Sequence, residues 1–151
     1  WKRTVTVTVN SFEVYDDSDI SGSGEITFDM RLNGGTSSRI YQNLNMSSGA
    51  NPTGLGISRT TTTALSSVLI EVRGQDDDCL TTTCYAPSSR WDTATNGDVD
   101  WATAKIGPIT IPDGSGVGTG GSGTWAGQAG VSKVGRLGFR VSGTWSVSYS
   151  R

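Results

Sequence analysis

The chain has 151 residues and a formal net charge of −2, and it contains 21 Gly, 20 Ser and 20 Thr but only three Lys. A length of this order suits one domain, so we treat residues 1–151 as a single unit, and the scarcity of good helix formers favours strands and turns. The scattered Arg residues give no basic surface for nucleic acid, and no apolar run approaches the ~18 residues that a membrane span needs.

Alternating apolar residues predict two strands near the start of the chain. Three Val residues alternate with Thr over residues 4–9, which is the period of a half-buried strand. The phase changes before Phe12, so we expect a β-bulge near residues 10–11. A second strand follows over residues 26–32, where apolar and polar side chains alternate without a break, and the turn residues 33–35 end it.

The signal is weaker in the middle of the chain. Residues 40–46 keep an apolar face, residues 47–59 read as a loop, and residues 60–63 suit a short edge strand. Residues 67–74 form another row of apolar side chains. The long excursion that follows, over residues 75–101, is typical of a functional loop.

The last third of the chain predicts a strand, a loop and a hairpin. The strand covers residues 104–111, and the Gly-rich stretch 113–130 reads as a long flexible loop. Residues 137–141 and 145–149 would then pair as a hairpin around a turn at 142–143. About eight strands with polar turns indicate an all-β fold, a single antiparallel β-sandwich or jelly roll.

The two cysteines, Cys79 and Cys84, lie five residues apart. Two reduced thiols or half of a metal site are the alternatives, but the chain has no further Cys and no His to complete such a site. We therefore expect a disulfide that closes a small loop. A disulfide favours an oxidising compartment, and so an extracellular, secreted or cell-surface protein.

Carboxylates gather in three turns that follow or lead strands. Carboxylates crowded at strand ends repel one another, so they need a cation, an Arg or open water. Solvated polar turns are one explanation, because Asp is common in turns; calcium is the other, because oxygen ligands without His or thiolate select it over zinc or copper. The candidate metal ligands are nine of the 14 acidic residues: Asp16, Asp17, Asp19, Glu25, Asp76, Asp77, Asp78, Asp98 and Asp100.

The first acidic turn carries part of a known calcium pattern. Asp17, Asp19 and Ser21-Gly22 match the opening half of an EF-hand loop, in which alternate oxygens converge on one ion. The twelfth position should hold a bidentate Glu but holds Phe28, which excludes a complete EF-hand. Glu25, at the ninth position, could bind directly or through water. The remaining oxygens would come from the other two acidic turns.

Several stretches together resemble a C2 domain. Residues 4–33 look like its first strand, first acidic loop and second strand. Residues 69–78 resemble its sixth strand and third calcium loop, and residues 98–100 and 105–107 are similar to the later aspartates of that loop and the opening of the next strand. The resemblance implies a C2-like sandwich, and it implies these calcium ligands: Asp17, Asp19, Asp76, Asp78 and Asp100.

The chain departs from the C2 pattern in two places. Gly24-Glu25-Ile26 stands where the family has Asp-Pro-Tyr, and residues 79–91 are inserted in the third loop. Basic residues for anionic lipid headgroups are scarce, so the resemblance does not imply phospholipid binding. We expect a C2-like secreted sandwich.

The sequence offers no obvious catalytic machinery. Without His, a Ser-His-Asp or Cys-His arrangement is impossible. Paired carboxylates can make a glycosidase, but here they lie in turns beside Gly and Ser and not in an aromatic cleft. We therefore expect that the protein is not an enzyme.

Two binding functions are left. Trp91, Trp101 and Trp125 fall in or beside expected loops, where a ring could stack on a sugar in a calcium-dependent carbohydrate-binding module, or could pack down as a lid over the core. We expect instead a calcium-stabilised extracellular structural or adhesive subunit that associates with itself or with another surface protein. The uncharged runs 4–9 and 145–150 either pair inside the sandwich or offer an edge to a neighbour.

Overall fold

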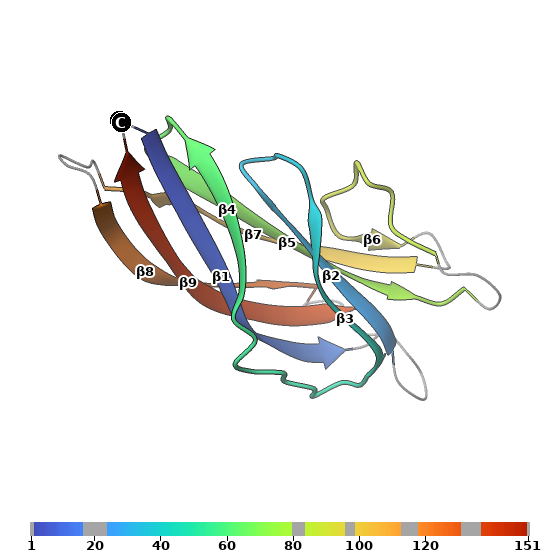
Figure 1. Cartoon of the computed structure of the whole chain (residues 1–151). Coiled ribbons are helices and arrows are strands. Elements are labelled where there is room, and N and C mark those ends of the chain that lie inside the picture. The colour runs from blue at the N-terminus through green and yellow to red at the C-terminus, as the bar shows by residue number, and fades with distance from the viewer. Residues whose placement is uncertain are drawn as a thin grey trace.

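The computed structural model describes residues 2–16, 24–79, 84–95, 99–112, 118–130 and 137–150, which form two antiparallel sheets packed face to face (Figure 1). One sheet has the order β4-β1-β9-β8, with β1 (Lys2–Asp16), β4 (Ile57–Thr63), β8 (Gly118–Ala129) and β9 (Gly138–Ser150). The other has the order β3-β2-β5-β7-β6, with β2 (Gly24–Leu32), β3 (Ser38–Met46), β5 (Ser67–Asp77), β6 (Ala94–Thr95) and β7 (Val99–Thr110). The predicted antiparallel β-sandwich is confirmed. The described ranges contain no helix long and apolar enough to cross a membrane.

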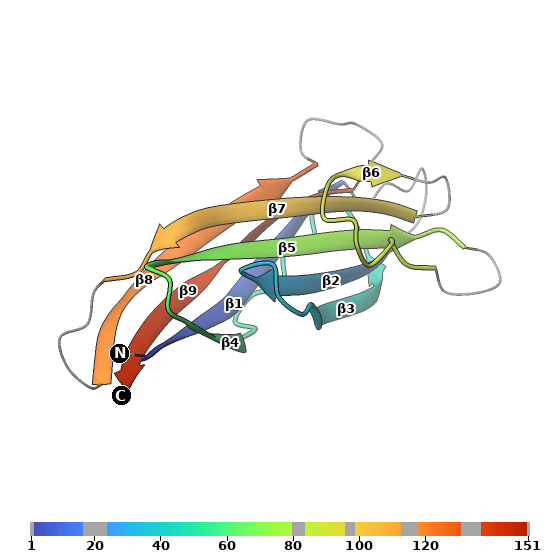
Figure 2. The same ribbon diagram turned by 90° about the horizontal axis from the view of Figure 1, so that it is seen from above.

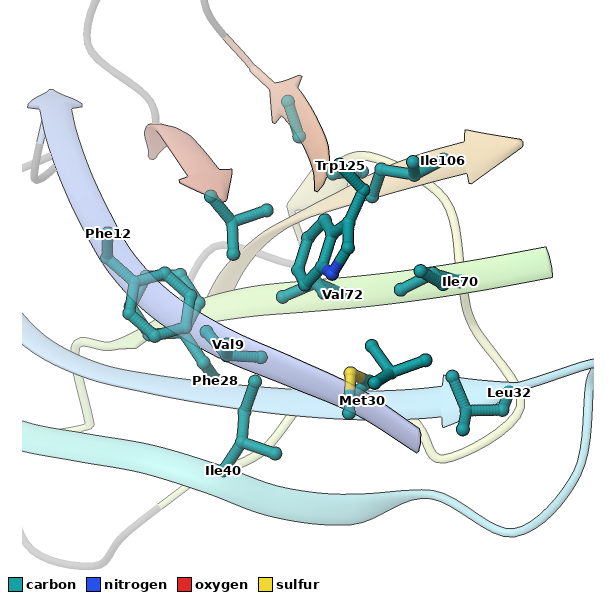
Figure 3. Packing of buried hydrophobic residues seen from close by; sticks show 14 of the residues in the cluster. Val9, Phe12, Phe28, Met30, Leu32, Ile40, Ile70, Val72, Ile106 and Trp125 are labelled. Carbon is teal, nitrogen blue, oxygen red and sulfur yellow. The ribbon is translucent and has the colours of Figure 1, made fainter. Parts of the chain in front are cut away.

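One continuous hydrophobic core lies between the two sheets. Phe12 of β1 stacks on Phe28 of β2 with ring centroids 3.9 Å apart, and Phe139 of β9 meets Phe28 edge-on at 4.9 Å. Aromatic side chains from both sheets thus meet in the same layer, and Figure 3 shows the aliphatic side chains of both sheets around them. Pairs in these two geometries add roughly 0.5–1.5 kcal/mol each beyond the area they bury.

The first strand follows the pattern that the sequence predicts. Its alternating Val side chains are fully buried, and its pairing with β9 shifts register between Val9 and Ser11. This shift confirms the predicted bulge near residues 10–11. The bulge returns Phe12 to the inner face after the change of phase.

The predicted loop over residues 113–130 is wrong over most of its length, because residues 118–129 form the strand β8. Glycines hide this strand, since they carry no side chain that could alternate between faces. They also make room for rings of the neighbouring strand β9. A Cβ at Gly120 would overlap the ring of Tyr149, and one at Gly123 would lie 2.6 Å from Nε1 of Trp145.

The predicted hairpin turn at residues 142–143 is also wrong, because β9 runs unbroken from Gly138 to Ser150. Gly143 is needed for close approach and not for a turn. A Cβ there would overlap the carbonyl oxygen of Thr8 and would lie 2.8 Å from the ring of Trp125. The apolar residues keep odd numbers on both sides of Gly143, which is the sequence signal for one continuous strand.

The other long loops are shorter than predicted. β5 continues through the acidic residues to Asp77, β7 starts at Val99, and β4 starts at Ile57. Backbone pairing with neighbouring strands therefore extends into residues whose side chains suggested turns.

The two terminal runs lie inside their sheet. β1 is flanked by β4 and β9, and β9 by β1 and β8. Neither run offers a free edge, so the prediction that one of them pairs with a neighbouring molecule is wrong and the interior alternative holds.

Candidate metal site and the covered face beside it

Four strand ends bring acidic residues to one end of the sandwich. Asp16 is the last residue of β1 and Asp77 the last of β5, while Glu25 and Asp100 are the second residues of β2 and β7. Because the strands alternate in direction, these ends lie together on the right-hand side of Figure 1. Asp78 follows β5 directly. Asp17, Asp19 and Asp98 lie outside the described residues.

Strand register places two of these carboxylates opposite each other. Asp76 pairs with Asp100 on β7 and with Ile26 on β2. Asp76 is fully buried, and Asp77 and Asp100 are half-buried. Like charges directly opposite on neighbouring strands destabilise a sheet, and burial raises the cost of a carboxylate. A divalent cation with oxygen ligands would offset both costs.

The predicted disulfide is present between Cys79 and Cys84. Its sulfur atoms and a carboxylate oxygen of Asp77 all lie within 4.8 Å of one another. Sulfur in a disulfide is not the thiolate that binds metals, so this group offers a metal only the carboxylate. Asp77 Oδ1 also accepts a hydrogen bond of 2.9 Å from the backbone N–H of Cys79. The disulfide therefore lies directly next to the acidic end of β5.

After the disulfide, residues 84–93 cross the outer face of the five-stranded sheet over β5 (Figure 2). Trp91 anchors this covering segment and is 5% exposed. The guanidinium groups of Arg31 and Arg73 lie 4.4 and 4.8 Å from the centre of its ring. Desolvated cation–π contacts can each contribute ~2 kcal/mol.

Hydrogen bonds hold the covering segment to the sheet. Arg73 donates to the carbonyl oxygens of Pro87 at 2.8 Å and Arg90 at 2.7 Å. Gln75 accepts a hydrogen bond of 2.6 Å from the backbone N–H of Ala86 through its Oε1. These bonds satisfy backbone groups of a segment that has no strand partner there.

Asp29 is the charged centre beneath the covering segment. Its Oδ1 accepts from Arg39 at 3.1 Å, and its Oδ2 accepts from Gln75 at 3.1 Å and lies 3.5 Å from Arg73. Burial lowers the pKa of Arg73, and the attraction of Asp29 opposes that shift. A second ion pair, between Arg31 and Glu71, lies next to this group, with hydrogen bonds of 2.8 and 3.1 Å.

Asp92 holds the end of the covering segment nearest β6 through hydrogen bonds. Arg90 donates to both carboxylate oxygens of Asp92, at 3.1 and 2.7 Å, and Trp101 Nε1 donates to Oδ1 at 3.0 Å. The hydrogen bond from Arg90, followed by that from Trp101, lowers the pKa of Asp92 to about 2.

The three tryptophans predicted as sugar-stacking platforms are covered. Trp91, Trp101 and Trp125 are 5%, 3% and 5% exposed, so none of them presents a ring face to solvent. Trp91 belongs to the covering segment and packs on Arg31 and Arg73. Trp101 packs with Ala86 of that segment, and Trp125 belongs to the core between the sheets. The rings are therefore not exposed for stacking on a sugar. The alternative of packing on the core fits Trp125, whereas Trp91 covers the guanidinium groups of Arg31 and Arg73.

Sequence reasoning missed this covered polar face. Asp29, Glu71 and Arg73 alternate with core residues, so their pattern predicts a solvent-facing side of the sheet. The one available signal was the insertion that follows β5, which carries Trp91 and can reach back over neighbouring strands.

Comparisons with known proteins found matches among solved structures only. No family model matches the chain, and no curated protein matches it. A C2 domain of a plant extended synaptotagmin 1 matches with a TM-score of 0.48 and 11% identity over 98% of this chain and 96% of that domain. Human GIVD cytosolic phospholipase A2, in complex with methyl gamma-linolenyl fluorophosphonate and terbium chloride, matches with a TM-score of 0.40 and 9% identity over 99% of this chain. This chain spans 32% of the phospholipase chain. The observed fold itself is an antiparallel β-sandwich of two sheets, the class of fold that the sequence predicts.

Proposed function

We propose that this chain is a calcium-stabilised extracellular β-sandwich subunit that acts by associating with copies of itself or with another surface protein, and not by catalysis. The observation that carries the calcium proposal is the register pair Asp76–Asp100, which sets two carboxylates opposite each other at one end of the sandwich. Asp77 ends the same strand as Asp76. Calcium accepts six to eight oxygen ligands in flexible geometry, so neighbouring turns can complete such a site.

Two features support the extracellular and associating parts of the proposal. The disulfide between Cys79 and Cys84 suits an oxidising compartment. The strand β8 stands at the end of its sheet and carries no charged residue among its twelve. Charges on an edge strand discourage pairing with other chains, so an uncharged edge favours association.

Thermal unfolding with calcium and with a chelator tests the metal. At a hundredfold excess over Kd, binding to the folded state alone adds about 2.7 kcal/mol, which corresponds to a rise in Tm of about 5–11 °C for a chain of this size. Asp100→Asn should reduce this rise. Asp113→Asn removes the same charge outside the three acidic turns of the sequence and should leave the rise intact.

Equal melting temperatures with calcium and with chelator would refute the calcium site. Light scattering at increasing protein concentration, with calcium present, tests association: the mass should rise. A monomer at the highest concentration that also captures no surface protein would refute association.

A further inference from the structure

The outer face of the four-stranded sheet carries two rows of hydroxyl side chains. Strands β1, β9 and β8 lie side by side there (Figure 1). Pairing aligns Thr6 with Ser146 and Ser146 with Ser122 in one row. The same pairing aligns Thr8 with Thr144 and Thr144 with Thr124 in the next row. The intervening Val5, Val7 and Val9 of β1 point into the core, so the hydroxyl rows face outward.

These rows line an open hollow of about 370 Å³. The lining consists of these six hydroxyl residues together with Gly123 and Trp145, and none of the eight residues is charged. Thr6, Thr8 and Ser146 form the half-buried floor, while the hydroxyl residues of β8 are exposed. This volume falls in the range of ligand sites in proteins.

The chemistry of the lining selects a neutral, hydroxyl-rich partner. Each hydroxyl can donate one hydrogen bond and accept two, so the rows suit a ligand that also carries both donors and acceptors. A charged ligand would lose hydration there without meeting an opposite charge. The ladder holds the strands that carry these side chains about 4.8 Å apart and the two rows roughly 6.7 Å apart along each strand. Little side-chain entropy is then lost on binding.

The rows continue beyond the hollow. Thr60 and Ser58 of the edge strand β4 pair with Thr6 and Thr8, and the hydroxyls of Thr8 and Ser58 are 2.7 Å apart. Each row therefore spans four strands. A track longer than one binding hollow suits an extended chain better than a single small molecule.

We propose that this face, the hydroxyl groove, binds a stretch of a neutral polysaccharide. A second copy of the chain fits less well, because a two-fold contact sets the same surface against itself and two facing hollows leave space unfilled. The groove is separate from the acidic strand ends, so its binding is independent of calcium. This inference goes beyond the function proposed above and does not depend on it.

Native gel electrophoresis in the presence of soluble polysaccharides tests the proposal. The gels contain a β-glucan, a mannan or a galactan as neutral probes, alginate as a polyanionic probe, or no polysaccharide. We expect at least one neutral probe to slow the protein, equally with calcium and with chelator, and alginate to have no effect.

The double variant Thr8→Val/Thr144→Val removes two hydroxyls while keeping the shape of the side chains and their preference for strands. It should weaken binding by about tenfold or more. Thr110→Val, an exposed strand position in the other sheet, is the matched control and should bind as the parent does. Thermal unfolding checks that both variants are folded.

Three results would overturn the proposal. One is that no neutral probe slows the protein. Another is that the double variant, folded, binds as tightly as the control. The third is a concentration-dependent dimer that the double variant abolishes, which would assign the groove to a second copy. If the double variant does not fold, backbone amide shifts of residues 6–8 and 144–146 in the parent on adding the bound probe decide the question, and unchanged shifts refute it.

Discussion

The buried carboxylate of Asp29 gives the sharpest test of the covered face. Replacing it with Asn removes the charge that faces Arg39 and Arg73, while the volume stays nearly the same. Both carboxylate oxygens of Asp29 now accept hydrogen bonds, from Arg39 on one side and Gln75 on the other. An amide has only one acceptor oxygen, so in either orientation its NH₂ group meets a donor.

The structure sets the size of the expected loss. The side chains of Arg73 and Asp29 are only 5% and 11% exposed. Breaking a buried ion pair by removing one partner costs roughly 3–5 kcal/mol. Arg73 keeps its bonds to two backbone carbonyl oxygens, so we expect the lower end, about 3 kcal/mol, or a fall in Tm of about 6–12 °C.

Denaturant unfolding of three variants measures this loss. Asp92→Asn, in an ion pair whose side chains are about half exposed, is the control and should lose less stability. Arg73→Met removes the other partner together with its bonds to two backbone carbonyl oxygens, and should lose at least as much stability as Asp29→Asn. An Asp29→Asn protein within about 1 kcal/mol of the parent would refute this account of the covered face, because that is the size of an exposed pair.

Three further predictions follow from the geometry. Gly143→Ala forces β1 and β9 apart and should lower the free energy of unfolding by about 3 kcal/mol; an unchanged urea midpoint would contradict the close approach. The unfolded, unreduced protein should show no free thiol on titration, and reduction of Cys79–Cys84 should cost roughly 2 kcal/mol, whereas two reactive thiols would exclude the bond. Because the pKa of Asp92 is lowered to about 2, its stabilising contribution is complete above the ordinary carboxyl pKa and disappears as the pH falls towards 2. NMR titration of Asp92 should therefore give a midpoint near 2, and an ordinary midpoint would contradict the hydrogen bonds from Arg90 and Trp101.

Local patterns predicted the strands whose inward side chains are large. The alternating Val residues of β1 predicted both which side chains face the core and where the bulge lies. The alternation over residues 26–32 predicted most of β2. The strand β8 escaped because its glycines leave no alternation to read, and its stability comes from rings on β9 that fill the space above them. Such a strand is visible only once its neighbour is known.

The candidate metal site was predictable in composition but not in register. The sequence locates acidic residues at strand ends, and the structure brings those of β1, β2, β5 and β7 to one end. The pairing of Asp76 with Asp100 depends on the alignment of two strands that are distant in sequence, and a shift by one residue would turn each side chain to the other face. The covered face also depends on contacts between distant parts of the chain, because Arg73 is buried where the segment with Trp91 returns over the sheet.

The pairing of the first and last strands also determines how this molecule responds to force. Lys2 and Ser150 are register partners, and Figure 2 marks both chain ends at the side opposite the acidic strand ends. The hydrogen bonds of an antiparallel ladder run across the strands, so tension between residues 2 and 150 peels β1 from β9 one pair at a time. Tension between residue 150 and the acidic end of β1 loads the whole ladder in shear, and many bonds must then break together. The protein should therefore resist force better when a partner bound at the acidic end pulls against residue 150 than when the two chain ends are pulled apart.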